Sequence, residues 1–174
     1  HPGTIVTEEH EAMEAVVIRG VSIERSQARV TITGIPDEPG MSGRILGVLG
    51  DDEINIDMIV SNIAHDGYAR HSFTMHTHDL GRAQASLKPV LSELGGEADL
   101  ETEAGIAKLS VVGIGMRSHS GVAAQMFKAL GESGINIGMI STSEIKISIT
   151  VAETCIEDAA RVVHQVFGLD SAPS

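Results

Sequence analysis

The sequence predicts an α+β fold made of two copies of one βαββαβ unit, each with two helices on one face of an antiparallel sheet. Three observations support this prediction. The 174 residues are 42% apolar and 21% charged, as is usual for a chain that folds around an apolar core. The segments that start at Arg29 and Lys108 repeat each other. In both, the alternation typical of strands changes to helical spacing at matching points.

The internal repeat is clearest in the glycines. Gly34 matches Gly113 at an offset of 79 residues. Beyond the following turn the offset is 81 residues, as for Gly50 and Gly131 and for the repeated Ile-Asn-Ile that starts at Ile54. Duplicated domains diverge by such loop insertions while the surrounding register is kept. We therefore expect two homologous units.

The first copy contains the complete set of elements. Apolar residues alternate with polar ones in its strands and recur at helical spacing in its helices, and Gly95 and Gly96 end the second helix. In order, we expect a strand at residues 29–33, a helix at 41–49, strands at 54–60 and 70–77, a helix at 80–94 and a short strand at 97–101. This order is the ferredoxin-like, split βαβ arrangement.

The second copy lacks its last strand. We expect strands at 108–114, 135–141 and 144–152 and helices at 121–130 and 156–167, after which seven residues remain. Residues 15–23 are rich in β-branched residues and precede the first copy without belonging to it. We therefore expect the first unit, residues 26–103, to be inserted into a discontinuous second unit made of residues 14–25 and 104–170.

Composition argues against several classes of function. The formal net charge is −12, and twelve Lys and Arg residues are scattered singly, so no basic face for nucleic acid or anionic lipid is expected. Aromatic residues, at 2%, are too few for base stacking. No apolar run approaches the roughly 18 residues of a membrane span. We expect a cytoplasmic protein with neither a nucleic acid nor a membrane as partner.

No residues suggest chemistry carried out by this chain. The single cysteine, Cys155, excludes an internal disulfide, and no Ser/His/Asp or Cys/His combination stands out. His76 and His78 are two residues apart on a predicted strand and would share a face, but two histidines at this spacing are a weak indication of a metal site. We expect no catalytic residues, no metal and no cofactor.

The turn GIPDEPG, residues 34–40, lies between a predicted strand and a predicted helix. A free amino acid needs an acceptor for its ammonium group and N–H donors for its carboxylate. Asp37 supplies a carboxylate, and Gly40 and Met41 open the helix with N–H groups that lack helical partners. The alternative is that Asp37 and Pro39 only shape the turn.

Three pairs of motifs carry a family resemblance. They resemble the regulatory part of aspartate kinase, and they are PGTIV with VVIRGV, GIPDEPG with INIDMI, and VGIGMRSHSGVAAQMFKAL with NIGMISTSEIKISI. The most specific stretch is ISTSEIKISI. The resemblance covers nearly the whole chain. It implies two ACT domains that bind end-product amino acids and relay feedback inhibition to a kinase domain, which phosphorylates aspartate with ATP. Residues 1–13 resemble the tail of that kinase module or a linker, and the kinase motif itself is absent. Such a regulatory piece is either a separate β subunit or the C-terminal part of a longer chain.

The resemblance also assigns effector-binding residues. It implies a threonine site between the first ACT domain of one chain and the second of a partner, hence a homodimer. The matching positions for threonine are Asp37, Gly40, Ser42, Ser61, Asn136 and Ile137, and those for lysine are Asp57, Ser143 and Glu144. Met41 is a candidate from its place at the helix start alone. Two positions depart from the family pattern: Ser61 stands where many members carry glutamine, and Gly138 where many carry an acidic residue.

Other interpretations stay open at this point. Asp57 is also consistent with a solvated strand carboxylate, and Ser143 and Glu144 with residues that shape a hairpin. For the whole chain, the alternatives are a small enzyme on the same scaffold, an architectural dimerisation domain without an effector, and the regulatory domain of another enzyme of amino-acid metabolism. Threonine, lysine or both, together with a catalytic subunit or domain of aspartate kinase, are the expected partners.

Overall fold

The computed structural model describes residues 17–63, 66–114 and 119–169. The chain divides into two compact units, a central unit, Arg25–Ala107, and a flanking unit formed by the chain up to Glu24 and from Lys108 onward. The expected tail at residues 1–13, the start of the predicted strand 15–23 and residue 170 lie outside the described residues. Among the described residues, no helix is both long enough and apolar enough to cross a membrane.

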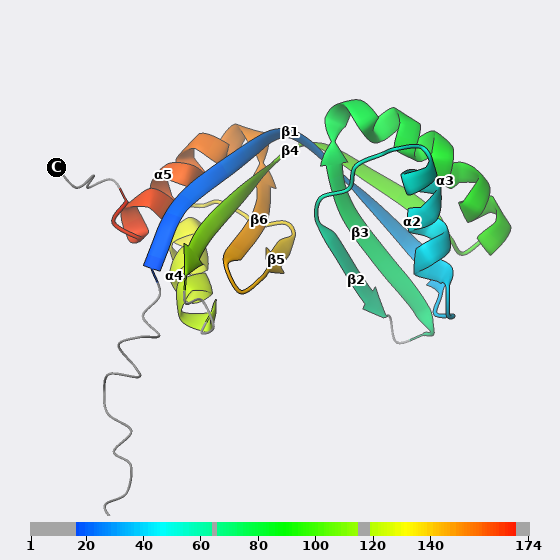
Figure 1. Cartoon of the computed structure of the whole chain (residues 1–174), viewed down its shortest axis with the longest axis horizontal. Coiled ribbons are helices and arrows are strands. Elements are labelled where there is room, and N and C mark those ends of the chain that lie inside the picture. Colours follow the sequence, from blue (N-terminus) through cyan, green and yellow to red (C-terminus); the bar gives the residue numbers. More distant parts are fainter. Residues whose placement is uncertain (1–16, 64–65, 115–118, 170–174) are drawn as a thin grey trace, which may run out of the picture. The chain divides into compact units, whose positions relative to one another are not determined.

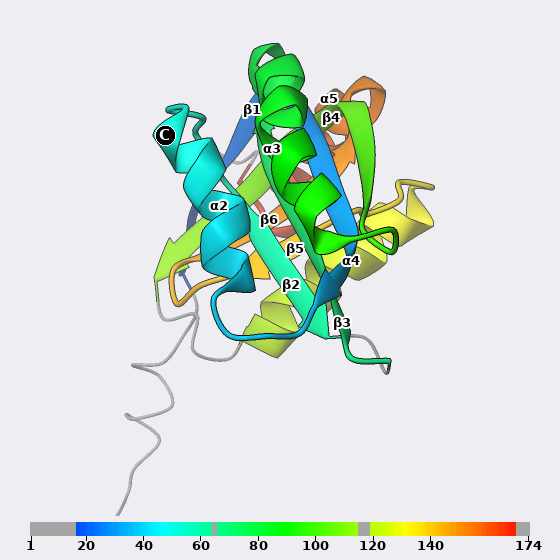
Figure 2. The ribbon, with the colours of Figure 1, turned by 90° about the vertical axis from the view of Figure 1, so that its right-hand side faces the viewer.

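The central unit is a layer of strands covered by two helices on one face (Figure 1, Figure 2). Its strands follow the order β2-β3-β1-β4. They are β1 (Val17–Pro36), β2 (Ile59–Ile63), β3 (Tyr68–His76) and β4 (Asp99–Ile114), and the helices are α2 (Met41–Asp51) and α3 (Leu80–Leu94), the latter preceded by a short 3-10 turn, η1 (Thr77–Asp79). Ile32, Ile45, Phe73 and Leu87 are fully buried in one apolar core that joins strands and helices.

The flanking unit repeats this design. Its strands follow the order β1-β4-β6-β5, with β5 at Ile140–Thr142 and β6 at Lys146–Ala152. Its helices are α4 (His119–Glu132) and α5 (Ile156–Val166), and the 3-10 turn η3 (Glu153–Cys155) precedes α5. Leu109, Met126, Leu130 and Ile147 form the largest buried side chains of this unit. The α+β class and the helix-covered antiparallel sheet predicted from the sequence are confirmed.

Two of the predicted strand breaks are wrong. The strands expected at 15–23 and 29–33 are parts of one strand, β1, and those expected at 97–101 and 108–114 are parts of one strand, β4. At the predicted breaks, β1 carries Ser26 with φ 57° and β4 carries Gly105 with φ 73°, both in the left-handed region, which β1 enters again at Gly34 with φ 68°. A single left-handed residue can be accommodated inside a strand as a local irregularity, so the polar stretches around Ser26 and Gly105 do not end the strands.

The strands expected at 54–60 and 135–141 begin later than predicted, at Ile59 and Ile140. The reason is the same in both units. The N–H of Met58 donates to Thr74 Oγ1 at 3.0 Å, and the N–H of Met139 donates to Thr150 Oγ1 at 2.8 Å. In each unit, a threonine hydroxyl therefore accepts the N–H that would donate to a backbone carbonyl in a regular strand pair, at the point where the segment joins the sheet.

Further matching hydrogen bonds show that the sequence repeat is a structural repeat. Thr31 and Ser72 share a hydroxyl hydrogen bond of 3.0 Å in the central unit, and Ser110 and Ser148 share one of 2.7 Å in the flanking unit. The main chain after α2 closes with Ile54 N donating to Leu49 O at 2.9 Å, and the chain after α4 closes in the same way.

Candidate functional site

The turn that precedes α2 presents a carboxylate to solvent. Asp37 is exposed, and its N–H donates to Gly67 O at 3.0 Å, which holds the turn against the start of β3. Among the described residues, neither a cation nor a hydrogen-bond donor contacts the Asp37 carboxylate. Gly40 is the N-cap residue of α2 with φ 91°, a conformation that strongly favours glycine. The carboxylate is thus held near a helix start and keeps its acceptor capacity.

The donors at the start of α2 differ from those predicted. The N–H of Met41 donates to Glu38 O at 3.3 Å, and the N–H of Arg44 donates to Gly40 O at 3.0 Å. The expectation that Met41 offers an unpaired N–H is therefore wrong, because the carbonyl of Glu38, three residues earlier in the turn, accepts it. Helix geometry leaves the N–H groups of Ser42 and Gly43 without partners inside the helix. The donors at the start of α2 are therefore those of Ser42 and Gly43 and not that of Met41.

Ser42 and Ser61, both predicted site residues, are brought together by a third residue. His71 on β3 is 5% exposed, with Ser42 Oγ at 2.9 Å from its Nε2 atom and Ser61 Oγ at 2.8 Å from its Nδ1 atom. Ser61 lies opposite His71 in the antiparallel β2–β3 pair, and Ser42 is in the first turn of α2. The start of α2 and strand β2 thus meet around one imidazole ring.

Sequence reasoning missed His71 as a site residue. The parity of the strand separates it from His76 and His78, and it shares a face with the buried residues Phe73 and Met75. A histidine in that pattern is a polar group on a core-facing position and therefore needs hydrogen-bond partners. The pattern shows that His71 requires partners, but it does not identify them.

Strand β2 exposes apolar side chains beside Ser61. Ile59 is 50% exposed and Ile63 is 70% exposed, and both share the face of Ser61. By contrast, Met58, which directly precedes β2, is buried. Asp57, assigned to lysine binding by the family resemblance, is exposed just before β2, and its N–H donates to Thr74 O at 3.0 Å.

The remaining predicted site residues lie in the flanking unit. Asn136 is exposed and Ile137 half-buried, in the segment that leads to β5. Ser143 and Glu144 are exposed in the β5–β6 connection, where the N–H of Ser143 donates to Lys146 O at 2.8 Å. Each unit therefore contributes its own set of candidate residues, six in the central unit and four in the flanking unit.

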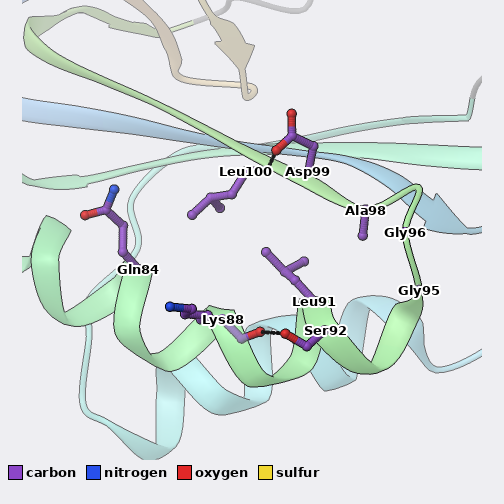
Figure 3. Close-up of a pocket in the computed structure, with 9 residues that line it drawn as sticks. All are labelled: Gln84, Lys88, Leu91, Ser92, Gly95, Gly96, Ala98, Asp99 and Leu100. Atoms are coloured by element: carbon purple, nitrogen blue, oxygen red, sulfur yellow. Dashed lines mark hydrogen bonds between the residues drawn. The ribbon is translucent and has the colours of Figure 1, made fainter.

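A hollow elsewhere in the central unit contains none of the predicted residues. It has a volume of about 570 Å³ and lies between α3 and the start of β4 (Figure 3). Leu91, Ala98 and Leu100 supply its apolar lining, while Gln84 and Lys88 extend from the helix at its rim. The Ser92 hydroxyl donates to Lys88 O at 3.0 Å, and Asp99 accepts from the N–H of Leu100 at 2.8 Å. The polar groups of Ser92 and Asp99 are therefore hydrogen-bonded to nearby backbone groups.

The two neighbouring histidines make local contacts. The N–H of His78 donates to His76 Nδ1 at 3.2 Å, and His78 Nε2 lies 3.4 Å from the Asp79 carboxylate. Within residues 17–63, 66–114 and 119–169, no group of three or more His, Cys, Asp or Glu side chains has the arrangement of a metal site.

Comparison with known proteins defines the class first. Residues 28–94 match the ACT domain family, and residues 109–167 match a second family of ACT domains. The chain is therefore a pair of ACT domains.

Individual relatives then define the family. An aspartate kinase of Pseudomonas putida is 45% identical over 171 residues, which are 98% of this chain and 41% of that protein. The crystal structure of aspartokinase alpha and beta subunits contains a chain 41% identical, with 87% of this chain and 99% of that one covered and a TM-score of 0.79. The ligand-free regulatory subunit of the Thermus thermophilus aspartate kinase is 38% identical, with 86% and 98% covered and a TM-score of 0.78.

The chain belongs to the aspartate kinase family, in which it corresponds to the regulatory region with two ACT domains. It spans about 41% of the length of the curated relatives such as the Pseudomonas putida enzyme. The family predicted from the sequence motifs is thereby confirmed.

Proposed function

We propose that this regulatory module binds an amino-acid end product, threonine first and lysine second or jointly, and relays feedback inhibition to an aspartate kinase catalytic domain or subunit. The observation that carries the proposal is the convergence of Ser42 and Ser61 on His71. The exposed carboxylate of Asp37 lies in the turn that leads into the helix of Ser42. An ammonium group pairs with the carboxylate, and the ligand carboxylate accepts from the start of α2.

The site is completed by a second copy of the chain. Ile59 and Ile63 flank Ser61 and are exposed, and apolar surface of this kind beside polar groups is typical of an interface. In a two-fold homodimer, the flanking unit of the partner supplies Asn136 and Ile137, and two equivalent sites result. Asp57, Ser143 and Glu144 form the lysine contacts under the same arrangement. The β5 residue Ile140, 44% exposed, is a further candidate for the dimer contact.

We further propose that the central unit corresponds to the first ACT domain, residues 26–103, inserted into the second, residues 14–25 and 104–170. The long strands β1 and β4, which both run through the two units, support this assignment. The catalytic partner is an aspartate kinase domain or subunit, and the crystal structure of aspartokinase alpha and beta subunits supports an assembly of this kind.

Calorimetric titration of the chain with each of the twenty amino acids, one at a time, tests the proposal. Threonine or lysine is expected to bind and, at about 100 times its dissociation constant, to stabilise the fold by about 2.7 kcal/mol. A second titration with the other amino acid present reports joint binding. If none of the twenty binds while sedimentation shows a dimer, the chain is an architectural dimerisation module instead.

A further inference from the structure

His71 has both ring nitrogens engaged and almost no contact with solvent. It is 5% exposed, and Ser42 Oγ and Ser61 Oγ lie 2.9 Å from Nε2 and 2.8 Å from Nδ1. Both serines are exposed residues, so they lie at the surface while their hydroxyls contact the buried ring. The ring therefore links two hydroxyls that come from different elements, α2 and β2.

An imidazole ring in its neutral form imposes opposite roles on the two hydroxyls that it contacts. One ring nitrogen carries the proton and donates, and the other accepts. The serine that donates to the ring uses its only proton there and keeps its lone pairs for a ligand. The serine that accepts from the ring N–H keeps its own proton and can donate it. One hydroxyl thus faces the ligand as an acceptor, and the other as a donor.

We propose that His71 is a positioning residue of the effector site, and that it fixes Ser42 and Ser61 in opposite hydrogen-bonding polarities that select a zwitterionic amino acid. The inference rests on the proposed amino-acid function. A zwitterion carries N–H donors on its ammonium group and acceptors on its carboxylate, one carbon apart, so it pairs with one hydroxyl of each polarity. A ligand that carries only a carboxylate or only an amine pairs with only one of the two hydroxyls.

A purely structural role for His71 predicts a different outcome. A polar ring on the core-facing side of β3 needs partners, and the two serines satisfy that need. If satisfaction of the ring were the only reason for the contacts, a phenylalanine at position 71 would be tolerated and effector binding would not change. If the ring orients the hydroxyls, binding weakens even where the fold is kept.

The test compares His71→Phe, His71→Gln and the control His78→Gln in the complete chain, with threonine as the probe in calorimetry. Phenylalanine removes both contacts, so the threonine affinity is expected to fall about 5- to 150-fold. Glutamine retains one donor group and one acceptor, so it is expected to restore part of the affinity. His78→Gln changes an exposed histidine outside the serine cluster and is expected to bind threonine like the parent.

A spectroscopic readout keeps the test decisive if His71→Phe does not fold. The parent and two serine variants are labelled with ¹⁵N. Relative to the parent, Ser42→Ala is expected to shift the Nε2 resonance of His71, and Ser61→Ala its Nδ1 resonance. Saturating threonine is expected to shift both. The inference is overturned if threonine binds the parent and moves neither resonance, or if a folded His71→Phe variant binds as tightly as the parent. If no amino acid binds the parent, the proposed function has failed first.

Discussion

Ser61 lies directly opposite His71 in the β2–β3 pair, and its hydroxyl oxygen is 2.8 Å from His71 Nδ1. The strand register sets this contact, because a slip of one residue would place Asn62 or Val60 opposite the ring and turn Ser61 to the other face. The candidate site is thus built on regular pairing within the sheet, and Ser42 joins it from the first turn of α2. The fold itself therefore orients these side chains.

The first prediction concerns the repeated threonine contact. Thr150 is buried, and its hydroxyl accepts the N–H of Met139 at 2.8 Å. Replacing Thr150 with Val keeps the shape but leaves a buried N–H group without its partner, at an expected cost of about 1–3 kcal/mol in the free energy of unfolding. Urea denaturation measures this cost.

The matched control is Thr142→Val on the neighbouring strand β5, where the threonine is exposed. This change is expected to alter the free energy of unfolding by less than about 0.5 kcal/mol. Equal effects of the two substitutions would show that the hydroxyl of Thr150 is not needed to hold the segment before β5.

The second prediction concerns Gly34. Its φ is +68°, and a Cβ atom at this position would lie 1.8 Å from the carbonyl oxygen of Glu97. Gly34→Ala therefore adds a left-handed penalty to a backbone clash and is expected to destabilise the chain by about 2–4 kcal/mol. Gly47→Ala in α2 is the control: a Cβ there meets no atom within 4 Å, and the change is expected to stabilise slightly. Thermal and urea unfolding of both variants separate these outcomes.

Local patterns predicted most elements of the fold. The apolar stripe of α3 and the glycines after it gave the helix at Leu80–Leu94, because periodicity and helix stop signals are local. The continuity of β1 and β4 was not predictable in this way. Whether Ser26 or Gly105 ends a strand depends on pairing with neighbouring strands, and no local pattern contains that information.

The candidate site shows the same limit. The turn at Asp37 and the helix start at Gly40 follow from residue types at a strand-to-helix junction. The partners of His71 do not, since Ser42 is 29 residues away in sequence and Ser61 is 10 residues away. The same applies to Met41, whose N–H is used by Glu38 O because of the particular path of the turn.

The third prediction tests the proposed dimer. Ile63 is 70% exposed at the end of β2, and burial of such a side chain between two copies would favour association. Ile63→Asp places a charge in that contact and is expected to weaken self-association at least about tenfold. Val166→Asp on α5, where the valine is 37% exposed, is the control and is expected to leave association unchanged. Sedimentation equilibrium measures both, and unchanged association of Ile63→Asp would argue that β2 lies outside the interface.

The last prediction concerns Asp37, whose carboxylate has no partner among the described residues. Asp37→Ala removes the charged acceptor proposed for the ligand ammonium group, so the threonine affinity is expected to fall about 10- to 150-fold. Since the side chain is exposed, the free energy of unfolding should change by less than about 0.5 kcal/mol. Calorimetry and urea denaturation measure the two quantities on the same sample.

Glu38→Ala provides the control for Asp37→Ala, because it removes an exposed carboxylate from the same turn and changes the net charge by the same amount. It should leave threonine affinity within about twofold, since long-range attraction between exposed charges is screened by salt. By linkage, Asp37→Ala should also relieve threonine inhibition of an aspartate kinase that carries this module, while activity without threonine is kept. If Asp37→Ala binds threonine and lysine as tightly as the parent, the ammonium group is held elsewhere and the assignment of this turn is wrong.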